Sequence, residues 1–227
     1  MDDEVRLLST LALKGAVERL AGQCQVATGV RLDADFAPTV GLLKRLREGE
    51  KADVLILTRE GLDELVGEGS VVAASKVDLA RSWVGIAVKA GQPHPDISNV
   101  AALRATLLAA RSVAYSKIGA SGIYFAGLIE KMGIASEIKA KATITAGFTA
   151  ERLSTGEADL AVQQLSELKQ VAGNEVIGPI PRELQTPAVF TAGRMASSQK
   201  VAQVDAILRY LASPEVAPVL RESGLEP

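Results

Sequence analysis

The stretch SVAYSKIGASGIYFAGLIEKMG, Ser112–Gly133, passes from a β-branched and apolar segment through a turn of small residues into an amphipathic helix. Gly119, Ala120, Ser121 and Gly122 lie where the strand becomes the helix. Small residues at such a point either make a tight connection or bring backbone N–H groups up to an anion. Because a helix N-terminus has unpaired N–H groups and a partial positive charge, the stretch favours an anion site at a strand–helix junction.

Strand-like and helix-like segments alternate along the rest of the chain, which predicts an α/β fold. The apolar segment ADVLILT, residues 52–58, is typical of a parallel strand buried on both faces. Further strands are expected at residues 4–10, 31–37, 82–91, 138–145, 159–164, 174–181 and 187–196. Helices are expected at residues 13–27, 38–50, 59–69, 100–110, 122–132, 148–154, 200–212 and 213–224, the last capped by Ser213 before Pro214.

Two lobes are predicted, each a mostly parallel sheet flanked by helices. Residues 1–87 and 188–227 form the first, discontinuous lobe, and residues 88–187 form the second as a self-contained βα series. Ligands of such proteins bind where the carboxyl ends of strands and the N-termini of helices converge, so a cleft between the lobes is the expected site.

Composition excludes several classes of function. The net charge is −2, with 25 Lys and Arg against 27 Asp and Glu, so we expect no nucleic-acid partner. A single Cys and a single His leave no material for a disulfide, a zinc site or a Ser-His-Asp triad, and we expect neither metal nor cofactor. The apolar runs are shorter than the roughly 20 residues of a membrane helix.

The first ten residues, MDDEVRLLST, are acidic where an export signal would be basic and then apolar. As written, the sequence therefore predicts a cytoplasmic protein; a leader removed beforehand would make it periplasmic. We expect a monomer.

Small polar and charged residues recur at the predicted strand ends. Each one alone is an ordinary helix cap, but several such termini facing one cleft indicate an anion site. The candidate ligand-binding residues are Ser9, Thr10, Thr39, Arg59, Lys117, Ala120, Ser121, Gly122, Gly147, Gln163 and Gln164.

The order of segments resembles the type 2 periplasmic-binding-protein fold, and within it the molybdate-type, ModA-like substrate-binding proteins of ABC transporters and the related aconitate isomerases. The resemblance covers nearly the whole chain and depends on residues 8–58, SWVGIAVKAG at 82–91, GEADLAVQQLSEL at 156–168 and the ending YLASPEVAPVLRESGLEP. It implies an oxyanion held by hydroxyls and N–H groups at helix starts, here at Ser9, Thr39, Ala120–Ser121, Gly147 and Gln163–Gln164. It also implies an ABC-transporter permease as a partner, if the chain serves transport.

The ligand is expected to be larger than molybdate. The second turn reads APTVG, without the paired serines of molybdate binders, and Gln163 and Gln164 stand where those proteins tend to have a tyrosine. Two amides, with Lys117 or Arg59 nearby, suit a di- or tricarboxylate.

Four readings remain open on the sequence. A protein that closes on a small organic anion comes first, and an isomerase that moves a proton on a tricarboxylate comes second; a molybdate or other oxyanion carrier is the third. A ligand-sensing domain of a LysR-type regulator is the least expected reading, because such regulators carry an amino-terminal DNA-binding helix-turn-helix and the sequence as given begins with its first predicted strand. For the isomerase, Lys117, Tyr124 and Glu167 are the candidate proton carriers.

Overall fold

The computed structural model describes residues 4–227, so the first three residues of the predicted first lobe and of the acidic N-terminus lie outside the described part. Two compact units are present: unit 1 comprises Met1–Arg81 and Ala188–Pro227, and unit 2 comprises Ser82–Pro187. The chain passes into unit 2 at Ser82, earlier than the predicted boundary after residue 87, because the strand that follows pairs only within unit 2.

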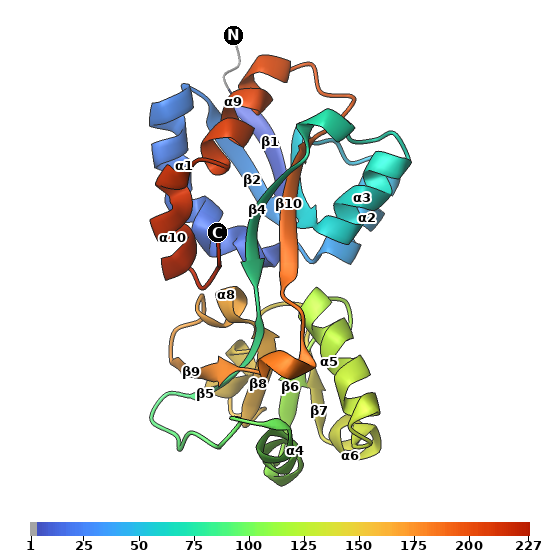
Figure 1. Cartoon of the computed structure of the whole chain (residues 1–227), viewed down its shortest axis with the longest axis vertical. Helices are drawn as coiled ribbons and strands as arrows, with labels where there is room; N and C mark the ends of the chain where they lie inside the picture. Colours follow the sequence, from blue (N-terminus) through green and yellow to red (C-terminus); the bar gives the residue numbers. More distant parts are fainter. Residues whose placement is uncertain (1–3) are drawn as a thin grey trace. The chain divides into compact units, whose positions relative to one another are not determined.

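Unit 1 is a five-stranded mixed sheet, in the order β2-β1-β3-β10-β4, with helices packed against it (Figure 1). Strands β1, β2 and β3 run parallel, and β10 runs antiparallel to β3. The strands are β1 (Glu4–Ser9), β2 (Arg31–Phe36), β3 (Val54–Thr58), β4 (Val77–Ser82) and β10 (Ala188–Arg194). The helices are α1 (Lys14–Thr28), α2 (Thr39–Arg47), α3 (Arg59–Gly67), α9 (Val201–Leu211) and α10 (Ala217–Glu222), with single turns η1 (Leu11–Leu13), η2 (Ala73–Ser75) and η4 (Pro214–Val216).

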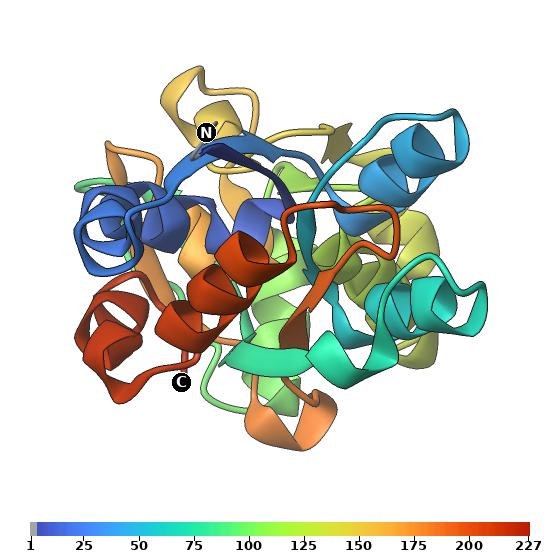
Figure 2. The ribbon, with the colours of Figure 1, turned by 90° about the horizontal axis from the view of Figure 1, so that it is seen from above.

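The two faces of this sheet bury separate apolar clusters. One cluster lies under α1, α9 and α10, and Figure 2 shows the red C-terminal helices beside the blue α1. The other lies under α2 and α3 and includes Leu42, Leu57 and Leu62, each fully buried. Burial on both faces explains why β3 is a continuous apolar run in the sequence.

Unit 2 has a second five-stranded mixed sheet, in the order β7-β6-β8-β5-β9. Strands β6, β7 and β8 run parallel, whereas β5 runs antiparallel to β8 and to β9. The strands are β5 (Val84–Lys89), β6 (Val113–Tyr115), β7 (Ala142–Ile144), β8 (Leu160–Gln164) and β9 (Asn174–Pro179). The helices are α4 (Val100–Ala109), α5 (Ala120–Lys131), α6 (Ala135–Ala140), α7 (Glu151–Ser154) and α8 (Leu165–Leu168), with the turn η3 (Arg182–Leu184).

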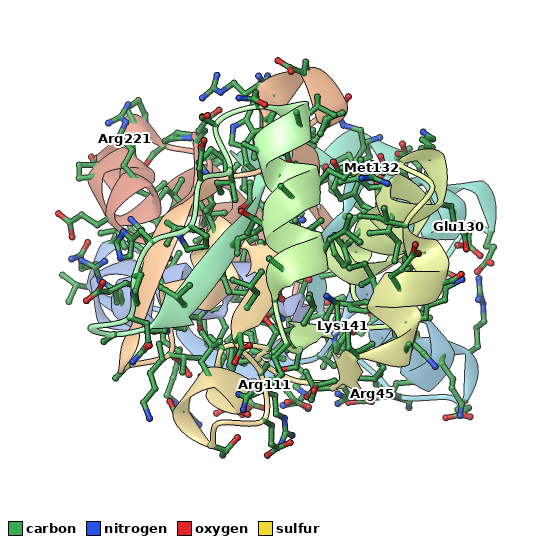
Figure 3. The ribbon with its side chains drawn as sticks, turned by 90° about the horizontal axis from the view of Figure 1, so that it is seen from below. Arg45, Arg111, Glu130, Met132, Lys141 and Arg221 are labelled. Atoms are coloured by element: carbon green, nitrogen blue, oxygen red, sulfur yellow. The ribbon has the colours of Figure 1, made fainter. Side chains whose placement is uncertain are left out.

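One lysine of unit 2 closes the end of a helix. The ammonium of Lys141 donates to the carbonyl oxygens of Leu108 (2.7 Å) and Ala110 (2.6 Å), at the C-terminal end of α4 (Figure 3). A cation at this end satisfies orphan carbonyls and opposes the negative end of the helix dipole.

Both units repeat one strand order. In each, the first of the three parallel strands lies between the second and the third, followed by an antiparallel strand and an edge strand. The switch in direction of winding falls at the carboxyl end of that first parallel strand, which is the position where open α/β sheets bind ligands. This position is Ser9–Thr10 after β1 in unit 1, and the stretch after Tyr115 of β6 in unit 2.

Most of the expected elements are present, with four differences. The strand expected at residues 138–145 is helical in its first half, as α6, and only Ala142–Ile144 pair as β7. The strand β4 and the short helix α8 were not expected. Ser213 precedes η4, but its buried hydroxyl has no hydrogen-bond partner among the described residues, so the predicted cap is wrong. In residues 4–227, no helix is both long and apolar enough to cross a membrane.

Candidate functional site

The start of α5 is held close to the end of β6 by packing and by one glycine. Phe125 of α5 is fully buried and meets Tyr115 of β6 edge to face, with ring centroids 5.2 Å apart. A Cβ added to Gly122 would lie 1.7 Å from the carbonyl oxygen of Ser116. Only glycine therefore allows the first turn of α5 to approach the strand end so closely.

Several donors at this helix start remain unused. The hydroxyl oxygen of Ser116 accepts the N–H groups of Ile118 (3.2 Å) and Gly119 (3.0 Å), which shapes the turn. Ser121 is only 2% exposed, yet its hydroxyl forms no hydrogen bond with another residue of the described chain. The exposed ammonium of Lys117 likewise has no ion pair in residues 4–227. Hydroxyl, ammonium and the opening N–H groups of α5 together are suited to an anion.

The loop after β7 is tied to the end of β8 by Gln163. The Gln163 Oε1 atom accepts the Thr149 backbone N–H (2.8 Å) and hydroxyl (3.0 Å), and its Nε2 atom donates to the Gly147 carbonyl (3.2 Å). A Cβ at Gly147 would meet no atom within 4 Å, so this glycine faces open space. Gln163 thus organises the loop, whereas its role as a ligand contact stays a prediction.

Gln164 connects the end of β8 to the residues before β5. The side-chain amide of Gln164 is oriented so that its nitrogen donates to the Ser82 carbonyl (3.1 Å) and the Trp83 carbonyl (3.3 Å). The Trp83 carbonyl also accepts the Leu165 N–H at 2.8 Å. Direct contact of Gln164 with a ligand likewise stays a prediction, because its amide is already engaged in this structure.

Glu167 is a buried carboxyl group at the same end of the sheet. Burial raises its pKa to about 7, although the backbone N–H of Gln164 and the side chain of Gln163 act in the opposite direction. Its Oε2 atom accepts the Gln164 N–H at 3.3 Å, as the reciprocal bond of a helix-capping turn does. A carboxyl group with a pKa near neutrality can both take up and release a proton at physiological pH.

The other two candidate proton carriers differ from Glu167. Tyr124 donates its hydroxyl to the Leu184 carbonyl (3.0 Å), and burial raises its pKa to about 12, so its anionic form is disfavoured near neutral pH. Lys117 lies exposed at the start of α5. Of the three, Glu167 alone combines full burial with a near-neutral pKa.

In unit 1 the strand-end hydroxyls bond to their own backbone. Thr58 caps α3 by accepting the Gly61 N–H (3.3 Å), and the Thr39 hydroxyl oxygen accepts the Thr58 N–H (3.2 Å). Ser9 is fully buried and donates to the Thr10 carbonyl at 3.2 Å. Arg59, the first residue of α3, forms an exposed ion pair with Asp78.

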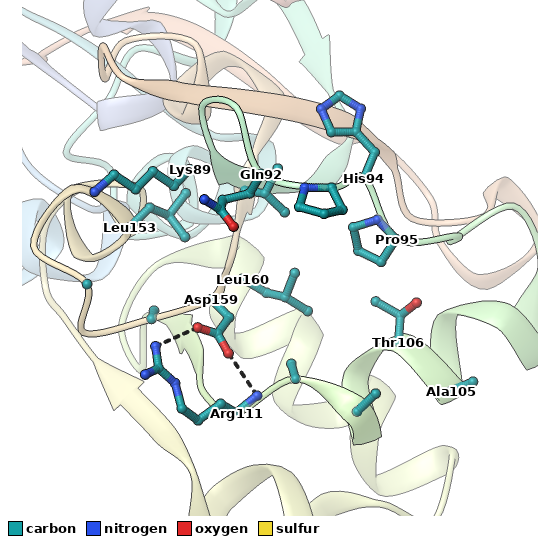
Figure 4. Close-up of a pocket in the computed structure, with 16 residues that line it drawn as sticks. Lys89, Gln92, His94, Pro95, Ala105, Thr106, Arg111, Leu153, Asp159 and Leu160 are labelled. Atoms are coloured by element: carbon teal, nitrogen blue, oxygen red, sulfur yellow. Dashed lines mark hydrogen bonds and ion pairs between the residues drawn. The ribbon is translucent and has the colours of Figure 1, made fainter.

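One pocket lies elsewhere in unit 2, near the end of β5 and the start of β8 (Figure 4). It measures about 830 Å³ and lies between β5, α4 and the start of β8, with walls that include Val88, Leu153 and Leu160. Two of its charged side chains are paired: Arg111 donates to Asp159 through its backbone N–H (2.9 Å) and its guanidinium (2.7 Å). None of the predicted site residues lines it.

Residues 4–227 contain no group of three or more His, Cys, Asp or Glu side chains placed to hold a metal ion. Trp83 was not among the predicted site residues, and it lies at the carboxyl end of the parallel strands because β5 runs antiparallel to β8. Only the antiparallel pairing of β5 with β8 reveals that position.

Comparison with known proteins identifies relatives over the whole chain. Residues 5–226 match the family model for bacterial extracellular solute-binding proteins. An aconitate isomerase from a Pseudomonas species is 39% identical over 228 aligned positions, which cover 97% of this chain and 87% of that protein. The structure is similar to the periplasmic molybdate-binding protein of Azotobacter vinelandii, with a TM-score of 0.83, 17% identity, and 98% and 99% of the two chains covered. The sulfate-binding protein of Mycobacterium tuberculosis gives a TM-score of 0.79 at 14% identity, with 99% and 86% covered.

Proposed function

Because the chain belongs to the family of bacterial extracellular solute-binding proteins, of the ModA type in its fold, we propose that it binds aconitate and interconverts the cis and trans isomers. The observation that carries the proposal is the 39% identity to an aconitate isomerase along nearly the full length of the chain. The molybdate- and sulfate-binding proteins share the fold at 17% and 14% identity, which supports no choice of ligand.

The reaction needs only a proton carrier and a site that holds carboxylates. A C–H bond of the methylene carbon breaks, its electron pair shifts the double bond, and a C–H bond forms on the former alkene carbon. Substrate and product are isomers, so no oxidant, reductant or leaving group is involved. A negative charge that spreads towards the carboxylates is stabilised by fixed donors around them.

The residues of unit 2 supply both requirements in this proposal. Lys117, the Ser121 hydroxyl and the opening N–H groups of α5 hold carboxylates, and Glu167 takes up and returns the proton. Support comes from the unused donors at α5 and from the pKa of about 7 at Glu167. For unit 1, Ser9, Thr10 and Thr39 stay predicted anion contacts.

The test follows cis-aconitate by proton NMR in the presence of the purified protein. We expect the trans signals to grow until the ratio of isomers stops changing, and deuterium from D2O to enter the exchanged positions. A matched thermal-shift series uses aconitate, citrate, sulfate and molybdate; a ligand at 100 times its Kd adds about 2.7 kcal/mol to stability. Stabilisation by molybdate or sulfate alone, without any interconversion, would contradict the proposal.

A carrier that binds without turnover is the second candidate, favoured by the family as a whole. In that case aconitate or another tricarboxylate raises the melting temperature and the NMR spectrum of the ligand stays unchanged. An ABC-transporter permease is then the expected partner.

A further inference from the structure

The single tryptophan of the chain has a buried donor that nothing in the described chain satisfies. The Trp83 indole Nε1 atom is buried and has no hydrogen-bond partner among residues 4–227. Buried indole N–H groups usually find an acceptor, because an unpaired one costs about 1–3 kcal/mol. The unpaired indole N–H of Trp83 therefore needs a physical explanation.

Trp83 lies at the same end of the unit 2 sheet as the candidate residue Gln164. It directly precedes β5, whose first residue, Val84, is in register with Gln164 at the end of β8. The amide of Gln164 donates to the Trp83 carbonyl, and Glu167 follows in the adjoining helix α8. The backbone of Trp83 is therefore hydrogen-bonded to the segment that contains Glu167, the candidate proton carrier.

The Trp83 ring also packs against a guanidinium. The guanidinium of Arg182 lies over its face, 4.6 Å from the ring centroid. The residue that follows Trp83 is anchored, since the Gln185 side chain accepts the Val84 N–H (2.9 Å) and donates to the Val84 carbonyl (3.0 Å). A donor held in this way suits an anionic acceptor, because the hydrogen bond is stronger when the acceptor is charged.

We propose that the Trp83 indole N–H donates a hydrogen bond to a carboxylate of the bound anion and so selects ligands with a carboxylate at that position. The inference rests on the proposed function, since it takes a tricarboxylate as the ligand. A hydroxyl oxygen can also accept the indole N–H, but it carries no charge, so a ligand that offers a hydroxyl group in place of a carboxylate is bound less well.

One 15N-labelled sample tests this inference, because the lone tryptophan gives a single indole N–H signal. Under saturating trans-aconitate we expect that signal to move downfield, and titration calorimetry to give the affinity in parallel. The saturated analogue tricarballylate, which cannot be isomerised, should move it as well. The proton NMR signals of cis- and trans-aconitate in the same sample report turnover, which separates the proposed hydrogen bond of Trp83 from the proposed isomerase activity.

Each outcome has one reading. Interconversion with an unmoved indole signal overturns the inference and leaves the function standing. A moved signal without interconversion supports the inference and overturns the isomerase. No binding of either tricarboxylate at millimolar concentration overturns both.

A variant gives an independent measurement. Trp83→Phe keeps an aromatic ring beside Arg182 and removes the donor together with part of the indole ring system, and we expect a loss of affinity for trans-aconitate of tenfold or more, as for a hydrogen bond to a charged group. The smaller ring also lowers the melting temperature without ligand through lost packing, so the affinity separates the two roles: a merely structural tryptophan would leave affinity intact. Tyr210→Phe, which removes a ring hydroxyl bonded to Gln23 in unit 1, is the matched control with unchanged affinity. Wild-type affinity in Trp83→Phe would overturn the inference.

Discussion

Units 1 and 2 share a strand order, yet the polar groups at the ends of equivalent strands are used differently. After β3, Thr58 caps α3 and receives support from Thr39. In unit 2, the Ser121 hydroxyl forms no hydrogen bond within the described chain, and the buried Trp83 indole N–H has no acceptor there. The buried Ser213 hydroxyl of unit 1 also lacks a partner in residues 4–227, but it precedes η4 and does not follow a strand. Hydroxyls bonded to a helix start are explained by folding, whereas donors left unpaired at strand ends are suited to a ligand. We therefore expect substitutions in unit 2 to affect ligands more than those in unit 1.

The largest effect is expected from Glu167→Gln. Glutamine also serves the capping turn, so the fold is retained, but it cannot exchange a proton. Turnover of aconitate should fall by about 10² to 10⁴, the usual contribution of a general acid–base group, with affinity changed only a few-fold. NMR rates and calorimetry measure both, and Glu137→Gln, an exposed change on α6, is the control. Full activity of Glu167→Gln would remove this residue from the mechanism.

The same residue predicts how stability depends on pH. The folded chain holds the Glu167 proton up to a pKa of about 7, against an ordinary 4.5. Between these values the folded state binds more protons than the unfolded state, so this stabilising contribution is complete below pH 4.5 and is lost as pH rises through 7. The loss is on the order of 3 kcal/mol for a fully buried group.

Urea unfolding of the wild type and of Glu167→Gln across this range measures the difference. The wild type should lose stability relative to the variant as pH rises. Parallel profiles would show that Glu167 does not titrate near neutrality.

A smaller effect is expected at the predicted anion-binding residues, where the affinities of variants in the two units can be compared directly. Lys117→Gln removes a cation that no described residue neutralises, and affinity for trans-aconitate should fall about tenfold. Lys131→Gln, at the far end of the same helix, should leave it unchanged. Thr39→Val in unit 1 should lower stability by about 1 kcal/mol, through the lost bond to Thr58, and affinity by less than about threefold. Equal losses of affinity in Lys117→Gln and Thr39→Val would end the distinction between the units.

Local patterns predicted most of the fold. The apolar run of β3 and the small-residue turn before α5 each identified an element and its place. The strand expected from residue 138 was wrong in its first half because Ile138 is fully buried against α5 and α4 as part of a helix, and a short β-branched run does not distinguish the two environments.

The candidate site was predicted less completely than the fold, because its hydrogen-bond partners depend on tertiary structure. Residue type indicates that Ser121 and Gln163 can bond, but only the structure shows that Gln163 bonds to Thr149 while Ser121 stays without a partner. Trp83 has no local signal at all, since its place depends on the antiparallel pairing of β5 with a strand about eighty residues later.

The contact between Gly122 and the Ser116 carbonyl has a consequence for comparing relatives. A homologue with any side chain at the equivalent of Gly122 must shift its helix along or away from the strand by ångströms, since the added carbon would lie 1.7 Å from that oxygen. Its opening amides would then point in a different direction. Glycine at the equivalent position therefore indicates that a relative keeps the same placement of this helix against its strand.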